Sequence, residues 1–183
     1  MNKEIEVKFK IEDIDKLHLD LEEAGYHLVD KVYQKTYSLW DKFRYLSRKG
    51  IFIRTRQDGD KHTFTVKTRD LNLKSEYAER NEYNVEVEDA GKVAEMLKII
   101  GFDDMRVLEK YRETWEGFDV DVVIDYTPIG DFMEIEGEKE EIDAFIERFN
   151  LNGLPRITMA YWDVYREDCK AKGIDEKNDL VFE

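Results

Sequence analysis

Seven segments of this chain of 183 residues alternate between charged and apolar side chains, and this pattern constrains the fold more than any other feature. In residues 3–11, four apolar side chains alternate with four charged ones: Ile5, Val7, Phe9 and Ile11 against Glu4, Glu6, Lys8 and Lys10. A period of two is typical of a β-strand with one apolar and one charged face. The other six segments are residues 51–57, 62–69, 80–88, 107–115, 118–126 and 132–138, and residues 26–40 also read as extended.

Helical spacing of apolar residues appears between these strands. It predicts helices near residues 14–24, 90–100, 142–149 and 158–172, with Gly25 and Gly101 ending the first two. Asp58-Gly59 lies between two strands and predicts a tight hairpin. Short turns favour antiparallel pairing, and about eight strands suit a closed barrel. We therefore predict an α+β fold: a closed eight-stranded antiparallel β-barrel with helices packed outside. Residues 1–172 would form one domain, followed by a polar C-terminal tail, residues 173–183.

Composition excludes several classes of protein. The formal net charge of −14 disfavours broad binding to nucleic acid or to an anionic membrane surface. The single cysteine excludes an internal disulfide and a cysteine-based zinc site. No apolar run approaches the ~20 residues of a membrane span, and residues 1–4 lack the apolar stretch of a signal peptide. We expect a cytoplasmic protein, either a monomer or a homodimer, that binds neither nucleic acid nor membrane.

The charged strand faces permit two arrangements. In the simpler one, an antiparallel sheet exposes its charged face to water. In the other, helices cover the apolar outside of a barrel and the charges line its interior, where they need compensation by opposite charge, water, metal or ligand. The signs are sorted: basic residues gather on some strands, and carboxylates form Glu-x-Glu pairs at Glu4/Glu6 and Glu134/Glu136. Guanidinium and ammonium groups suit phosphate, and paired carboxylates suit a hard divalent cation. A metal polyphosphate would satisfy both sets in a basic lumen.

An ordered set of motifs between residues 4 and 136 resembles the CYTH superfamily of triphosphate tunnel metalloenzymes, which includes class IV adenylate cyclases and thiamine triphosphatases. The set begins with Glu4-Ile5-Glu6-Val7-Lys8 and continues with Ile53-Arg54-Thr55-Arg56, Thr65-Val66-Lys67, Arg80-Asn81-Glu82, Lys110-Tyr111-Arg112, and Asp125 leading to Glu134-Ile135-Glu136. Near the C-terminus, Ala160-Tyr161 stands where a Ser-Tyr pair is common in the family.

The resemblance implies roles for these residues. Phosphate binding would fall to seven basic residues: Lys8, Arg54, Arg56, Lys67, Arg80, Lys110 and Arg112. Mg²⁺ or Mn²⁺ would bind Glu4, Glu6, Glu134 and Glu136, and the catalytic candidates would be Glu82 and Asp125.

Three functions remain open. We favour hydrolysis of a nucleoside, thiamine or inorganic triphosphate. The alternatives are a class IV adenylate cyclase, which converts ATP to cyclic AMP and pyrophosphate, and a binding module that turns nothing over. Trp40, Trp115 and Trp162 are predicted to pack in the core rather than to contact a ligand.

Overall fold

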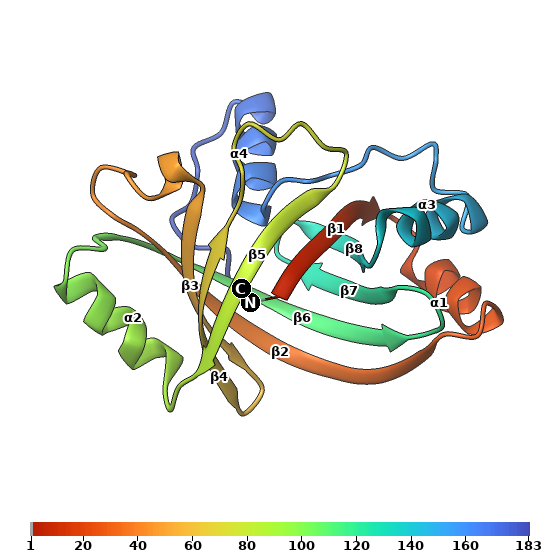
Figure 1. The fold of residues 1–183 in the computed structure, drawn as a ribbon, viewed down its shortest axis with the longest axis horizontal. Helices are drawn as coiled ribbons and strands as arrows, with labels where there is room; N and C mark the ends of the chain where they lie inside the picture. The colour runs from red at the N-terminus through yellow and green to blue at the C-terminus, as the bar shows by residue number, and fades with distance from the viewer. Residues whose placement is uncertain (1) are drawn as a thin grey trace.

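The computed structural model describes residues 2–183 and contains one closed β-barrel. Its strands are β1 (Asn2–Ile11), β2 (His27–Trp40), β3 (Ile51–Asp58), β4 (Lys61–Thr68), β5 (Ala78–Glu86), β6 (Asp104–Glu116), β7 (Asp121–Thr127) and β8 (Gly130–Glu136). They pair antiparallel in the order β1-β5-β4-β3-β2-β6-β7-β8, and β8 closes on β1 (Figure 1). The predicted α+β fold and eight-stranded antiparallel barrel are confirmed.

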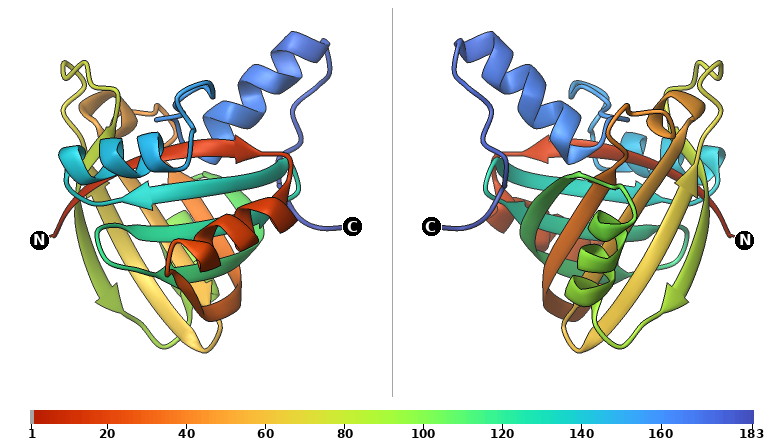
Figure 2. Two further views of the ribbon diagram at one scale, coloured as in Figure 1. Left: turned by 90° about the vertical axis from the view of Figure 1, so that its right-hand side faces the viewer. Right: turned by 90° about the vertical axis from the view of Figure 1, so that its left-hand side faces the viewer.

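Four helices pack outside the barrel: α1 (Ile14–Glu23), α2 (Ala90–Ile99), α3 (Lys139–Arg148) and α4 (Tyr161–Lys172). Figure 2 shows α1 and α3 beside β1, β7 and β8, and α2 on another side of the barrel. A short 3-10 helix, η1 (Ser47–Lys49), lies in the loop between β2 and β3. Within residues 2–183, none of the helices has the length and apolar character required to cross a membrane.

The main hydrophobic core lies between the barrel and its helices, not inside the barrel. It combines the outward side chains of four strands with one face each of α1 and α3, including Val7, Phe9, Leu21, Val122, Ile124, Met133, Ile135, Ile142 and Ile146, all nearly inaccessible to water. Because strand side chains alternate, burying the apolar face on the outside turns the charged face inward. Of the two arrangements open to the charged faces, the chain adopts the charged interior.

Several element boundaries differ from the sequence prediction, and four elements begin three residues away from the predicted start. One of the four, β6, begins at Asp104 rather than at residue 107. Strand β7 begins at Asp121 rather than at residue 118, because the preceding residues form the turn from β6. Helix α3 begins at Lys139, three residues early, where Glu138 and Glu141 form a capping box that satisfies free backbone N–H groups. Helix α4 begins at Tyr161 rather than at residue 158.

The loop between β2 and β3 is anchored to β4 through Gly50. Gly50 ends η1 with a φ of +74°, a conformation that suits glycine, and its carbonyl accepts a hydrogen bond of 2.9 Å from the Arg69 N–H. A Cβ at Gly50 would lie 2.2 Å from the Arg69 carbonyl oxygen. This close backbone contact fixes the loop beside the end of β4.

The C-terminal tail packs against the barrel. The backbone of Leu180 exchanges hydrogen bonds of 2.8 Å with Val107 and Glu109 of β6, on the part of that strand that β7 does not reach. The Leu180 side chain is only 3% exposed and packs in a second apolar cluster with Leu108 and Trp162.

Candidate functional site

The barrel interior holds a continuous cavity of about 790 Å³. All seven basic residues expected to bind phosphate line it: Lys8, Arg54, Arg56, Lys67, Arg80, Lys110 and Arg112. So do the four expected metal ligands and one catalytic candidate: Glu4, Glu6, Glu134, Glu136 and Glu82. Six strands contribute these side chains, each from its inward face, so the closed barrel brings together residues up to 132 positions apart in the chain.

Asp125, the remaining candidate, lies behind the cavity wall. Its carboxylate has no exposed surface and contacts two of the lining cations. Lys110 Nζ lies 2.5 Å from Oδ2, and the Arg112 guanidinium donates two hydrogen bonds of 2.7 Å, one to each oxygen. Arg112 also contacts Glu134 at 2.5 Å. Asp125 therefore holds two lining cations in place without being exposed to the cavity itself.

Burial shifts the pKa values of this group in opposite directions. For Asp125, burial raises the pKa, but Arg112 and Lys110 more than offset it and hold the pKa below its usual value. For Lys110, burial and then Arg112 lower the pKa to about 7, and the attraction of Asp125 only partly opposes this. A lysine that titrates near neutral pH thus faces the cavity.

A second group of ion pairs lies along β1, β4 and β5. Lys67 bridges two carboxylates, with Nζ 2.6 Å from Glu4 and 2.5 Å from Glu82. Arg54 approaches Glu82 at 3.2 Å. Burial raises the pKa of Glu82, but Arg54 and Lys67 overcome this and lower it to about 2. Glu82 is therefore ionised at neutral pH and already bonded to cations.

Lys8 and Arg80 complete the pairing. Lys8 lies 3.0 Å from Glu134 and 3.2 Å from Glu6, and Arg80 lies 2.6 Å from Glu6. If Asp125 is included, the six carboxylates of the group nearly balance its seven cations. The sequence analysis predicted a basic lumen. The net charge of the lumen is closer to zero than that prediction implies, because most of its lysines and arginines pair with carboxylates.

Two of the predicted site residues that line the cavity lack an ionic partner within the described part of the chain. Arg56 donates from Nε to the Thr36 hydroxyl at 3.1 Å but reaches no carboxylate. Burial, and then Arg54 and Arg112, lower its pKa to about 9. Glu136 reaches no cation within ion-pair distance, and burial followed by repulsion from Glu4 and Glu6 raises its pKa to about 7. The predicted site thus contains one uncompensated arginine and one uncompensated glutamate, and Arg69, which also lines the cavity, pairs with no carboxylate among the described residues either.

No three Asp, Glu, His or Cys side chains among residues 2–183 already form a metal-binding cluster. Glu4, Glu6 and Glu134 each contact a lysine or an arginine instead. In sequence register, however, Glu6 pairs with Glu136 and Lys8 pairs with Glu134 across β1 and β8, so the four glutamates lie on adjacent strands.

Tyr161 and a set of residues at the cavity's end were not among the predicted site residues. Tyr161, the first residue of α4, donates its phenol hydrogen to Asp125 Oδ2 at 2.7 Å. The end of the cavity beside η1 and α4 is lined by Trp40, Phe52, Ile53, Leu108, Trp162, Arg44 and Arg69. In the sequence, the resemblance of Ala160-Tyr161 to the Ser-Tyr pair of the family pointed to this region. It did not predict which side chains face the cavity.

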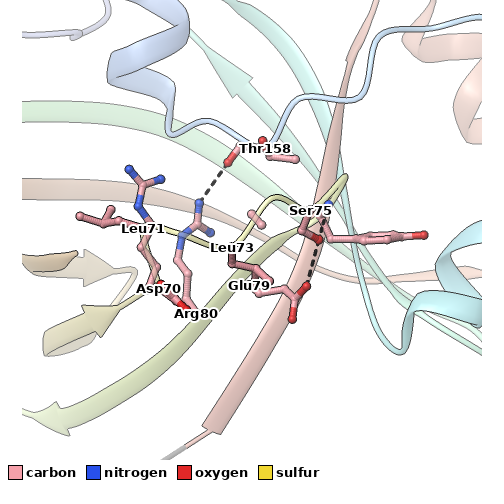
Figure 3. Close-up of a pocket in the computed structure, with 10 residues that line it drawn as sticks. Asp70, Leu71, Leu73, Ser75, Glu79, Arg80 and Thr158 are labelled. Carbon is pink, nitrogen blue, oxygen red and sulfur yellow. Dashed lines mark hydrogen bonds between the residues drawn. The ribbon is translucent and has the colours of Figure 1, made fainter. Parts of the chain in front are cut away.

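A smaller pocket of about 220 Å³ lies beside the barrel cavity, between the β4–β5 connection and Thr158 (Figure 3). Arg80 lines both cavities, and its guanidinium donates to the Thr158 carbonyl at 3.4 Å. The Ser75 hydroxyl donates to Glu79 at 2.9 Å. Arg80 therefore forms part of the wall between the two spaces.

Known proteins share this architecture. The family model described as CYTH domain matches residues 2–153. MJ0240 of Methanocaldococcus jannaschii, named as a candidate adenylate cyclase, is 26% identical over 141 residues, which cover 76% of this chain and 79% of that protein.

Solved structures agree on the fold. The PH1012 protein of Pyrococcus horikoshii OT3 superposes with a TM-score of 0.73 at 22% identity, covering 87% of this chain and 98% of that one. HpAC1 from Hippeastrum, a candidate adenylyl cyclase described as having a dominant triphosphatase activity, gives a TM-score of 0.64 at 13% identity, covering 97% of this chain and 100% of that one.

Proposed function

The chain belongs to the CYTH domain family, and from this premise we propose that it is a metal-dependent enzyme that binds a triphosphate in its tunnel and hydrolyses it. The observation that carries the proposal is the cavity itself, into which seven lysine and arginine side chains converge beside a group of glutamates. Few small molecules need so many cationic donors at one place, whereas a triphosphate has oxygens along its whole length for them to bind.

The charge balance of the lumen supports a ligand that carries both signs. The ion pairs between lining residues compensate most of the charge, and among the predicted site residues Arg56 and Glu136 remain without an ionic partner in the described chain. A triphosphate oxygen would compensate Arg56, and a divalent cation would compensate Glu136. A metal triphosphate therefore matches the two unpaired groups better than a bare anion does.

The residues present fit a divalent metal. Glu4, Glu6, Glu134 and Glu136 lie on the neighbouring strands β1 and β8, and burial followed by repulsion from Glu4 and Glu6 raises the pKa of Glu136. Carboxylate oxygens are the ligands that Mg²⁺ and Mn²⁺ prefer. Held by these carboxylates, Mg²⁺ or Mn²⁺ would supply positive charge that neutralises the charge developing on the phosphates during phosphoryl transfer.

The protein's own side chains would do most of the positioning. Lys8, Arg54, Arg56, Lys67, Arg80, Lys110 and Arg112 would hold the phosphate oxygens. Asp125 would keep Lys110 and Arg112 at the wall, a role that follows from its position behind them. Glu82 faces the cavity and stays ionised, so it could accept a hydrogen bond from the attacking water. Phosphoryl transfer depends chiefly on this kind of alignment and charge stabilisation.

Cyclisation of ATP is the second candidate, favoured by the name of the 26% identical relative. The same tunnel would hold the triphosphate, and the ribose 3′-hydroxyl would attack the α-phosphorus, with pyrophosphate leaving. The two reactions differ in which phosphorus meets the nucleophile.

The test is incubation with Mg²⁺ or Mn²⁺ and, separately, ATP, thiamine triphosphate or inorganic triphosphate, with quantification of phosphate and of cyclic AMP. Release of phosphate from at least one substrate supports hydrolysis. Formation of cyclic AMP and pyrophosphate without release of phosphate would contradict hydrolysis and indicate an adenylate cyclase. Thermal stabilisation by a triphosphate without any product would instead indicate a binding module.

A further inference from the structure

The loop between β2 and β3 carries positive charge on an acidic protein. Residues 41–50 contain four basic side chains and one acidic side chain, whereas the whole chain has a formal net charge of −14. The one acid, Asp41, directs its carboxylate to the backbone N–H groups of Tyr45 and Leu46 rather than to a cation. The loop is therefore a region of positive potential on a surface that otherwise repels anions.

Three cations of this loop have no counter-ion in the protein. Lys42 and Lys49 lie over the rings of Phe43 and Tyr45, and Arg48 donates to the Phe43 carbonyl. None of the three reaches a carboxylate within residues 2–183, and all three are exposed. The lysines and arginines of the barrel cavity mostly pair with carboxylates. The loop cations, in contrast, remain available to an anion that arrives from solvent.

The same loop forms part of the cavity wall. Arg44 and Ser47 line the cavity, and so does Arg69, whose backbone N–H bonds to Gly50 at the end of the loop. Because Arg69 is also exposed to solvent, the cavity reaches the surface at this end. Figures 1 and 2 show the loop at the same end of the barrel as the β4–β5 connection and α4, opposite the β3–β4 hairpin. An anion that enters here passes the loop cations before it reaches the paired cations inside.

We propose that Lys42, Arg48 and Lys49 steer the anionic substrate into the tunnel, so that they raise its association rate without contacting the bound ligand. The inference rests on the proposed function, because it takes a triphosphate as the ligand. A net charge of −14 slows the approach of such an anion. Unpaired cations at the entrance offset this repulsion over about one Debye length, ~10 Å at 0.1 M salt. Steering changes the association rate and weakens with salt, whereas contacts with the bound ligand chiefly change the dissociation rate.

The test compares Lys42→Glu/Lys49→Glu with Lys61→Glu/Lys92→Glu as the matched control. Both double variants change the net charge equally, and none of the four lysines lines the cavity. Lys61 begins β4 at the opposite end of the barrel, and β4 has eight residues, or about 26 Å. The backbone at the start of α2 bonds to His62, so Lys92, in the first turn of α2, lies at that end as well.

Stopped-flow fluorescence of Trp40 and Trp162, which line the cavity, follows the binding of inorganic triphosphate and of ATP, each with Mg²⁺ and with a chelator. At about 0.05 M salt, we expect Lys42→Glu/Lys49→Glu to lower the association rate constant about tenfold, within the range of steering effects. The control should lower it by less than about twofold. At about 0.5 M salt the difference should shrink to within about twofold. Dissociation rate constants should stay within about twofold in both variants.

Equal association rates in the two double variants would overturn the proposal, because the position of the charge would then not matter. A tenfold loss that persists in high salt, or faster dissociation, would overturn it too, since either result indicates contact with the bound ligand or a change of structure. Arg48 is left unaltered because its hydrogen bond supports the loop.

Lys42→Gln/Lys49→Gln makes half the change in charge and should lower the association rate constant about threefold. It decides the proposal if the glutamate variant fails to fold. If the unaltered protein binds neither ligand under either condition, the proposed function fails and the inference fails with it. If the unaltered protein binds a ligand and the variants associate at equal rates, only the inference fails.

Discussion

The phenol oxygen of Tyr161 lies 2.7 Å from Asp125 Oδ2, the same carboxylate oxygen that Lys110 contacts at 2.5 Å. Burial, and then the charge of Asp125, raise the pKa of Tyr161 well above its usual value, so the phenol stays protonated and donates. Tyr161 is the first residue of α4. A single buried carboxylate oxygen of Asp125 on β7 thus connects the last helix, through Tyr161, with Lys110 at the cavity.

Tyr161→Phe should lower the free energy of unfolding by about 1.5–3 kcal/mol, the usual contribution of a buried hydrogen bond to a charged group. Chemical denaturation measures the loss. Tyr165→Phe is the control on the same helix. The Tyr165 hydroxyl bonds to the backbone N–H of Lys177 and to the Cys169 side chain rather than to a carboxylate, so its loss should cost about 1 kcal/mol or less. Equal losses in the two variants would show that the bond to Asp125 adds nothing.

The barrel and its charged interior could be predicted because strand alternation fixes which side chains share a face. Once Val7 and Phe9 are assigned to a buried outer face, Glu6 and Lys8 must point the other way. The sequence does not show which strands become neighbours or in what register. Pairing of Arg112 with Asp125 across β6 and β7 sets the two side chains next to each other on the inward face, and neither residue's local sequence indicates this.

The positions of Trp40 and Trp162 at the cavity could not be predicted from the sequence for a similar reason. Six of the eight strands lie between the two residues in the sequence, and both were expected simply to pack in the core. They do pack beside apolar neighbours, but each also lines the cavity. The direction from which α4 approaches depends on the chain between α3 and α4, which pairs Ile157 with Lys8 of β1, and no periodic pattern predicts that bridge.

Binding of a triphosphate should be accompanied by proton uptake at Lys110. Its pKa is about 7, so at pH 8 the side chain is mostly neutral. Phosphate oxygens nearby raise that pKa and favour the charged form, and the protein must then take up a proton. At pH 6 Lys110 is already charged, and its uptake should fall toward zero.

Calorimetry in buffers of different ionisation enthalpy, without divalent metal and with ATP as ligand, measures this uptake. Subtracting the value for Lys110→Met removes contributions from ATP and from other groups. The difference should approach one proton at pH 8. A difference near zero at both pH values would mean that Lys110 is charged before the ligand binds.

Glu134 and Glu136 should respond oppositely to replacement by glutamine. Glu134→Gln leaves Lys8 and Arg112 with a weaker partner, and breaking such buried pairs costs about 3–5 kcal/mol of unfolding free energy. Glu136→Gln breaks no ion pair and removes repulsion from Glu4 and Glu6, so stability without metal should stay the same or rise. Denaturation in a chelating buffer tests both.

Addition of Mn²⁺ then tests whether Glu136 binds the metal or is only repelled by the neighbouring carboxylates. Mn²⁺ should raise the Tm of the unaltered protein and raise it clearly less in Glu136→Gln, because binding to the folded state stabilises it in proportion to affinity. If Mn²⁺ raises both Tm values equally, Glu136 does not contact the metal.

The tail provides the last prediction, which concerns where the domain ends. We propose that the folded unit extends past residue 172 through Leu180, whose backbone bonds to β6 and whose side chain packs beside Trp162. Leu180→Ala should therefore lower the unfolding free energy by about 2–3 kcal/mol, as expected for a buried leucine. Val181→Ala, at a side chain that is 40% exposed, should change it by less than about 0.5 kcal/mol. Equal losses in the two variants would show that the packing of Leu180 adds nothing to the stability of the domain.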